Sequence, residues 1–173
     1  MHITSVMCTS HDARWVLLIF TVPALPSRIR AAVWREVNRV GATYIRDGVC
    51  VLPEQEGTLK AFQAIGARIK SDGGRSTLVR GARLDPEQGL QVVSESRAKR
   101  TAEYDAIVQE ASSFVAYLRQ EKEHRRLTSA ELDRLGADLV KLHRWIEQVH
   151  ARDYFGADDR TRTEGSLQAC EAE

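Results

Sequence analysis

The chain lacks the features that identify several common classes of protein. Its three cysteines, Cys8, Cys50 and Cys170, are scattered and form no Cys-x-x-Cys pair, so neither a disulfide framework nor a zinc site is indicated. It contains no Gly-x-Ser-x-Gly motif, no Walker loop and no Gly-x-Gly-x-x-Gly after a strand, which are common signatures of hydrolases and nucleotide-binding enzymes. We therefore expect a cytoplasmic, non-enzymatic protein without a cofactor.

A strong net charge and a membrane-spanning segment are also lacking. The formal net charge of the 173 residues is +1, so any contact with a polyanion must come from a local concentration of basic residues. The apolar run from Trp15 to Leu25 is about half as long as a membrane span, and Pro23 interrupts it. An amphipathic pattern follows it, which disfavours a signal peptide. The hydrophobic content of 43% suffices for a sizeable core.

Residues 14–84 alternate between strand and helix patterns. Ser27 is a suitable N-cap for the first helix and Gly41 a suitable end, while Asp47-Gly48 favours a tight hairpin turn or a bulge. The expected elements are a strand at 14–22, a helix at 27–40, two short strands within 42–52, a helix at 58–71 and a strand at 75–83. The order β-α-β-β-α-β predicts an α+β fold of the ferredoxin-like type, with two helices on one face of an antiparallel sheet.

Residues 85–156 have a helical pattern throughout, beginning at Asp85-Pro86. Two apolar seams run along this segment, and they predict a long antiparallel helical hairpin. The seams consist of Tyr104, Ile107, Ala111, Phe114 and Leu118, and of Leu132, Leu135, Leu139, Leu142, Ile146 and Val149. Residues 1–13 are expected to be a flexible leader and residues 157–173, which are polar and without a period, a disordered tail.

The first helix carries the candidate site, because arginine occupies its opening turn. Arg28 and Arg30 oppose the helix macrodipole there, and an anion would satisfy both the free N–H groups and the guanidinium groups. Arg28, Arg35 and Arg39 share one stripe, whereas Ile29, Val33, Val37 and Val40 form an apolar stripe elsewhere on the helix. The residues predicted to bind an anion or DNA phosphate are Arg28, Arg30, Arg35, Arg39 and Arg46. A merely solvated basic face is the alternative.

Other chemistry-bearing residues have structural interpretations. The pairs Glu121 with His124 and Glu147 with His150 have the Glu-x-x-His spacing of di-iron bundles. A hairpin would hold its two histidines roughly 30 Å apart, so we predict no metal site. Cys50, inside an apolar strand, is expected to be an inert core residue. Trp34 and Trp145 lie on helices beside apolar seams and are expected to anchor packing.

The run WVLLIFTVPALPSRIRAAVWREVNRVGATYIRDGVCVLP, with LVKLHRWIEQVHARDYFGA near the end, closely resembles the N-terminal domain of the ChrB family. The resemblance extends from about Arg14 to Ala157. It implies a regulator of bacterial chromate resistance that controls transcription of a chromate efflux operon. Promoter DNA and the chromate oxyanion are the ligands that such a regulator would meet.

The same resemblance has departures that shape what we expect. Full-length ChrB proteins carry a further C-terminal domain, so the chain resembles a stand-alone N-terminal module, with a separately encoded C-terminal domain protein as a candidate partner. The first half is also similar to the middle domain of PaaX-type repressors and, more remotely, to the CRISPR adaptation endonucleases. Those nucleases have an aspartate near the end of the first strand, where this chain has Thr21.

Three functions follow, in order of preference. The first is transcriptional regulation through the arginine surface. The second is a homodimeric protein-interaction scaffold that pairs through sheet edges or the leucine seam and does not bind DNA. The third is a divalent-metal nuclease, for which only Asp47 among the sheet residues could serve as a ligand.

Overall fold

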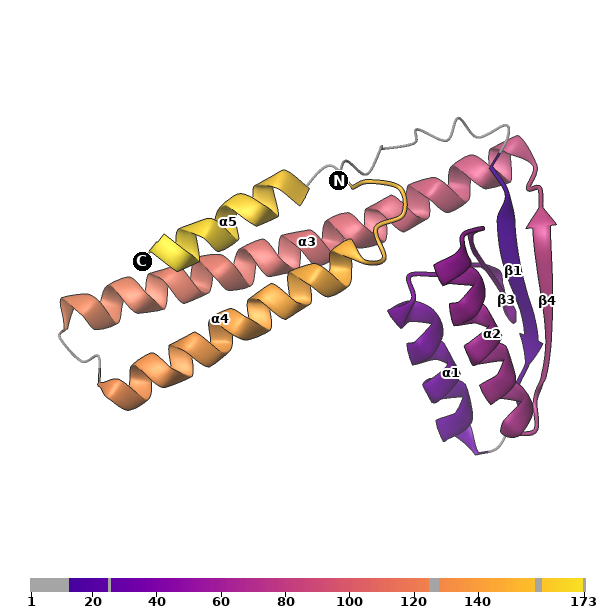
Figure 1. Ribbon diagram of the computed structural model, residues 1–173, viewed down its shortest axis with the longest axis horizontal. Coiled ribbons are helices and arrows are strands. Elements are labelled where there is room, and N and C mark those ends of the chain that lie inside the picture. The colour runs from indigo at the N-terminus through magenta and orange to yellow at the C-terminus, as the bar shows by residue number, and fades with distance from the viewer. Residues whose placement is uncertain (1–12, 25, 125–127, 158–159, 173) are drawn as a thin grey trace. The chain divides into compact units, whose positions relative to one another are not determined.

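The structure is a computed structural model that describes residues 13–24, 26–124, 128–157 and 160–172 (Figure 1). Most of the expected leader, residues 1–12, lies outside this range. The elements are β1 (Trp15–Thr21), α1 (Ser27–Arg39), β2 (Thr43–Arg46), β3 (Val49–Pro53), α2 (Glu56–Ser71), β4 (Arg75–Ala82), α3 (Pro86–Glu123), α4 (Ser129–His150) and α5 (Arg160–Ala172). The order of the first six elements matches the expected β-α-β-β-α-β pattern.

The four strands form one antiparallel sheet in the order β2-β3-β1-β4. Helices α1 and α2 lie on the same face of this sheet (Figure 1). The predicted α+β class with a ferredoxin-like first unit is confirmed. Strand β2 is the edge strand next to β3, and the turn of the β2–β3 hairpin lies against the end of β1, where the candidate site begins.

The core of the first unit lies between the sheet and its two helices. Val16 and Leu18 alternate along β1 and pair with Leu52 and Cys50 of β3, which places all four on one face of the sheet. The helices contribute residues at helical spacing, and these are fully or nearly fully buried: Val33 and Val37 from α1, and Phe62, Ile65 and Ile69 from α2. The apolar stripe predicted for α1 therefore faces the sheet.

The Asp47-Gly48 turn connects β2 to β3 as predicted and is tied to β1. Gly48 has a φ of 71°, and a Cβ atom there would lie 2.4 Å from the carbonyl oxygen of Phe20. The backbone N–H of Phe20 donates a hydrogen bond of 2.7 Å to the Gly48 carbonyl. Only glycine fits this close approach, which fixes the turn against the end of β1.

The ends of α1 differ in how well they follow the sequence prediction. Ser27 is not the N-cap: Pro26 is, in an extended conformation, and its carbonyl accepts the N–H of Ile29 at 3.1 Å. Ser27 is already helical, so its hydroxyl cannot cap, and no side chain caps this helix start. At the other end Gly41, with a φ of 78°, follows the last turn as predicted.

The helices α3, α4 and α5 form a second apolar core. Helices α3 and α4 run antiparallel with α5 alongside them (Figure 1). The predicted seams supply most of this core, which consists of Tyr104, Ile107, Leu142, Ile146, Val149, Ala157 and Leu167, with Phe114, Leu139 and Trp145 packed against it. Trp145 is therefore a packing residue, as expected.

The prediction of a disordered tail is wrong for residues 160–172, which form α5. Thr163, Leu167 and Cys170 are buried along one side of this helix. Their spacing of four and three residues is helical, but small and polar residues separate them, so the apolar pattern is weak. Packing on α3 and α4 stabilises a helix that its own sequence supports poorly.

The described chain divides into two compact units, one ending at Ser96 and the other beginning at Arg97. The division falls inside α3 rather than between residues 84 and 85, because the helix continues from one unit into the other without a linker. Among the described helices, none combines the length and the apolar character needed to cross a membrane.

Candidate anion-binding surface

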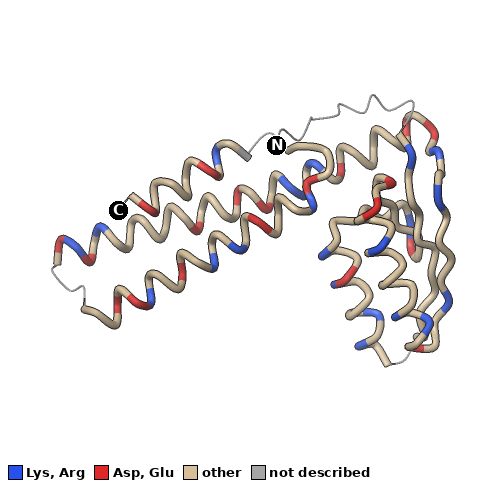
Figure 2. The backbone as a smooth tube through the Cα atoms, in the orientation of Figure 1, with Lys and Arg blue, Asp and Glu red and all other residues tan. Residues whose placement is uncertain are grey.

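The predicted arginine stripe is present on α1. Arg28, Arg35 and Arg39 are exposed, whereas Val33 and Val37 on the opposite side of the helix are buried. Figure 2 shows several blue basic positions along α1 with one red acidic position among them. Within the described part of the chain, none of these three guanidinium groups has a hydrogen bond or an ion pair. Their positive charge is therefore open to solvent and to an external anion.

The single acidic residue of α1 does not neutralise the stripe. Oε1 of Glu36 lies 2.8 Å from Nη1 of Arg68 on α2, so this carboxylate faces the neighbouring helix. The first turn of α1 contains no acidic residue. Since a helix start already carries partial positive charge, Arg28 adds its charge to a region that is already positive.

Arg30 and Arg46 lie apart from the stripe. Arg30 lines a groove of 430 Å³ between α1, the end of β1 and the β2–β3 hairpin, and Asp47 lines the same groove. Arg46 is exposed at the end of β2, one residue before Asp47. The five predicted residues thus divide among three places, namely the stripe, the groove and the hairpin.

Aromatic side chains that the sequence reasoning did not assign to a site line this groove. Phe20 and Tyr44 meet edge to face, with ring centroids 6.5 Å apart, and Trp34 lies across from them on α1. Trp34 is 60% exposed, so the expectation that it anchors packing is wrong. It lies four residues after Arg30, outside the apolar stripe that faces the sheet. That helical position was the available signal for an exposed aromatic beside an arginine.

Two ionisable groups near the groove stay neutral over a wide pH range. Burial raises the pKa of the Tyr44 phenol to about 12, with a smaller contribution from Cys50. Burial also raises the pKa of the Cys50 thiol to about 12, and its Sγ donates to the carbonyl of Leu18 at 3.7 Å. Cys50 is fully buried, so its prediction as a core residue is confirmed, and a thiolate nucleophile is not formed near neutral pH.

The metal-site alternative gains no support from the arrangement of histidines and carboxylates. In the described residues, no three His, Cys, Asp or Glu side chains gather in a way that could hold a metal ion. His143 instead lies 2.9 Å from Glu171, and His150 lies 3.9 Å from Glu164, so both histidines face carboxylates of α5. Asp47 lines the groove but is exposed.

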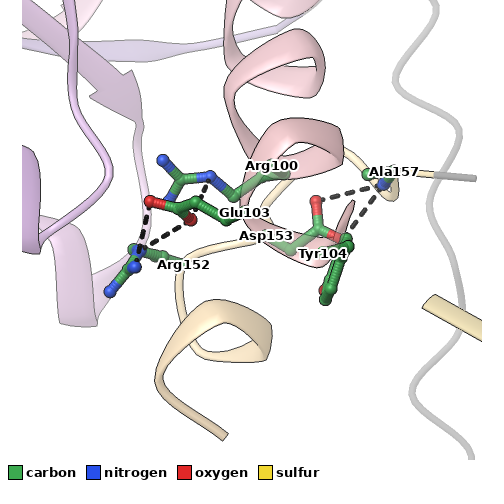
Figure 3. Close-up of polar contacts among 6 residues, drawn as sticks. All are labelled: Arg100, Glu103, Tyr104, Arg152, Asp153 and Ala157. Carbon is green, nitrogen blue, oxygen red and sulfur yellow. Dashed lines mark hydrogen bonds and ion pairs between the residues drawn. The ribbon is translucent and has the colours of Figure 1, made fainter. Parts of the chain in front are cut away.

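The second unit has its own arginine cluster, and here the charges are paired (Figure 3). Glu103 of α3 lies between two guanidinium groups, 3.2 Å from Nε of Arg100 and 3.1 Å from Nη2 of Arg152. Arg100 is 5% exposed, and burial lowers its pKa while Glu103 opposes that change. Asp153 accepts hydrogen bonds from the Tyr104 hydroxyl and from the backbone N–H of Ala157. These contacts hold the chain that follows α4 against α3.

Comparison with known proteins agrees with the resemblance in the sequence. A family model described as "Protein ChrB, N-terminal" matches residues 30–173, which include α5. A curated relative, "Protein ChrB" of Cupriavidus metallidurans, is 28% identical over 160 residues, which cover 90% of this chain and 45% of the relative. The chain thus spans about half the length of that relative. No solved structure matches the chain. Because the family model covers most of the sequence, the chain belongs to the ChrB family, in the part described as its N-terminal region.

Proposed function

We propose that the chain is a regulatory module of bacterial chromate resistance that contacts DNA phosphates through the arginine stripe, Arg28, Arg35 and Arg39. Membership in the ChrB family supports the regulatory role and a cytoplasmic location. The position of the stripe supports the kind of ligand. Arginine contacts to phosphate release counterions from DNA and give affinity without reading the sequence.

One observation carries the proposal: the stripe is exposed and lacks intramolecular partners in the described chain, although the chain has almost as many acidic as basic residues, 24 against 25. Other arginines of the same unit do pair with acids, as Arg68 does with Glu36 and Arg80 with Glu54. Glu36 points toward α2 and leaves the stripe uncompensated. A surface of this kind fits a ligand that brings its own negative charges.

The test is a titration of fluorescein-labelled duplex DNA from the promoter of the chain's own operon, followed by anisotropy at several salt concentrations. Replacing Arg35 and Arg39 by alanine removes two cations from the stripe. We expect the slope of log affinity against log salt to fall by about 2, since each phosphate contact contributes about 0.9. If the double variant binds the duplex with an unchanged slope, the stripe is not part of the DNA interface.

A matched control removes the same charge from another helical surface. Lys99 and Arg144 are exposed residues of the second unit, and the structure shows no ion pair for either within its described residues. Their double alanine variant should bind the duplex as the wild type does. Adding chromate at constant ionic strength to the wild-type titration tests the oxyanion alternative, because chromate at the stripe would compete with DNA.

The scaffold alternative is favoured by exposed apolar residues on α4. Leu132 and Val140 are 54% and 57% exposed. The rest of the leucine seam is largely occupied within the second unit, since Leu135, Leu142 and Val149 are buried. Homodimerisation through α4 therefore needs its exposed apolar residues rather than the buried part of the seam, and sedimentation velocity of the wild type against Leu132→Lys and Val140→Lys tests whether they supply the interface.

A further inference from the structure

The groove beside α1 has the composition of a site for a planar, anionic ligand. Its volume of 430 Å³ is within the range of about 300–1,000 Å³ found for small-molecule sites. Aromatic rings form its walls, and it contains one cation and one carboxylate. An apolar peptide would leave both charged groups without partners, whereas a nucleotide offers a flat ring, hydrogen-bond donors and a phosphate.

Trp34 supplies the stacking surface. It is 60% exposed, whereas Val33 and Val37 of the same helix are buried, so intramolecular packing does not explain its place. Phe20 and Tyr44 line the same groove and contact each other edge to face. Aromatic side chains of this kind stack with unpaired bases in proteins that bind single strands.

Asp47 supplies an acceptor at the edge of a stacked ring. It precedes Gly48, whose carbonyl is hydrogen-bonded to the N–H of Phe20, so the backbone that carries Asp47 is tied to β1. A carboxylate accepts from ring and amino N–H groups. Guanine presents two adjacent donors that match the two carboxylate oxygens, whereas thymine presents one.

Arg30 supplies the phosphate contact at the groove and lies apart from the stripe. On the helical wheel Ala31 lies between Trp34 and Arg35, so the groove and the stripe occupy neighbouring sectors of α1. One helix therefore presents both surfaces.

From this arrangement we propose that the groove binds one unstacked nucleobase, preferably guanine, with its phosphate toward Arg30, carried by a free nucleotide or by single-stranded DNA. The proposal deepens the proposed function, since the same helix presents both surfaces. It assigns recognition of a base to Trp34 and Asp47, and phosphate contacts outside the groove to the stripe.

Isothermal titration calorimetry with GMP, TMP and guanosine tests the site, and a fluorescein-labelled guanine-containing single strand tests the second source. We expect GMP to bind more tightly than TMP, and Trp34→Ala to weaken GMP binding by roughly tenfold or more. Trp34→Phe, which keeps an aromatic ring, should retain most of the affinity. Asp47→Asn should abolish the preference for GMP over TMP. Arg30→Ala should weaken the binding of GMP but not that of guanosine, which has no phosphate. If the single strand binds and GMP does not, the base comes from single-stranded DNA rather than from a free nucleotide.

Trp34 and Asp47 are both exposed, so their variants should fold, which circular dichroism verifies. Trp145→Phe, in the second unit, serves as the matched tryptophan control. The proposal is overturned if neither GMP nor the strand binds, or if both bind Trp34→Ala and Asp47→Asn as tightly as the wild type. Duplex affinity measured in parallel separates the two proposals: duplex binding with an inert groove overturns only this one, and nucleotide binding without duplex binding overturns only the proposed function.

Discussion

The helical unit and helix α1 of the sheet unit differ in how their arginines are partnered. In the helical unit several arginines are paired: Arg152 bonds to Glu103, Arg134 lies 2.8 Å from Glu131, and Arg97 donates to the carbonyl of Phe155. On α1 of the sheet unit, the arginine stripe has no such partner in the described chain. A paired arginine is explained by the fold that surrounds it. An exposed arginine that opposes its own helix dipole costs stability, so an external ligand is the better explanation.

The largest expected difference between the units concerns alkaline pH and arises in the sheet unit. Burial raises the pKa of Cys50 from 9.0 to about 12, so the thiol ionises in the unfolded chain before it does in the folded chain. Stability is therefore full below pH 9 and declines as the pH rises toward 12, by up to about 4 kcal/mol. Tyr44, whose pKa is also raised to about 12, adds to this decline above pH 10.

Urea unfolding followed by tryptophan fluorescence measures this decline. Buried Trp15 reports on the sheet unit and Trp145 on the helical unit. Cys50→Ala should lower the stability at pH 7 slightly but flatten its fall between pH 9 and pH 11. If the variant declines as steeply as the wild type, the thiol is not the group that titrates.

The next effect tests whether the paired arginines of the helical unit are structural. Glu103→Ala leaves Arg100 and Arg152 close together without their shared carboxylate, and both side chains are mostly buried. We expect the free energy of unfolding to fall by about 3 kcal/mol, as when one partner of a buried pair is removed. Chemical denaturation of the helical unit, followed through Trp145, provides the measurement.

Glu56→Ala is the matched control, because its ion pair with Lys60 at 2.6 Å is highly exposed on both sides. Removing this exposed pair should change the stability by less than about 0.5 kcal/mol. Equal losses in the two glutamate variants would show that the buried cluster contributes no more than a surface pair, and the contrast between the units would fail.

The sequence predicted the elements of the fold better than it predicted the roles of exposed residues. Strong periodicity made β1, α1, α2 and the two long helices recognisable, and Asp47-Gly48 marked the hairpin. Helix α5 was missed because small and polar residues separate its apolar positions, and only packing on α3 and α4 reveals the common side of Leu167 and Cys170. The division within α3 was missed because no linker marks it.

Within the candidate site, the sequence predicted the stripe but not the groove. A wheel shows that Arg28, Arg35 and Arg39 share a side, because this depends on one helix alone. The groove needs β1, α1 and the hairpin together, and Phe20 and Tyr44 are 24 positions apart in the chain yet in ring contact. Trp34 was assigned to packing because aromatic residues beside an apolar stripe are commonly buried.

The smallest effect is the most direct test of why the two units differ. Arg28 lies in the first turn of α1, where no side chain caps the helix and no acidic residue offsets the dipole. Arg28→Glu should therefore raise the free energy of unfolding of the sheet unit by about 0.3–1 kcal/mol, because a carboxylate favours a helix start. The same change should weaken binding of duplex DNA. Arg75→Glu, also an exposed arginine of this unit but at the start of β4, should bring no such gain in stability. If Arg28→Glu gains stability while it loses affinity for duplex DNA, arginine is kept at this position for function and against the preference of the helix. If the variant loses both stability and affinity, Arg28 stabilises the fold as the paired arginines of the helical unit do.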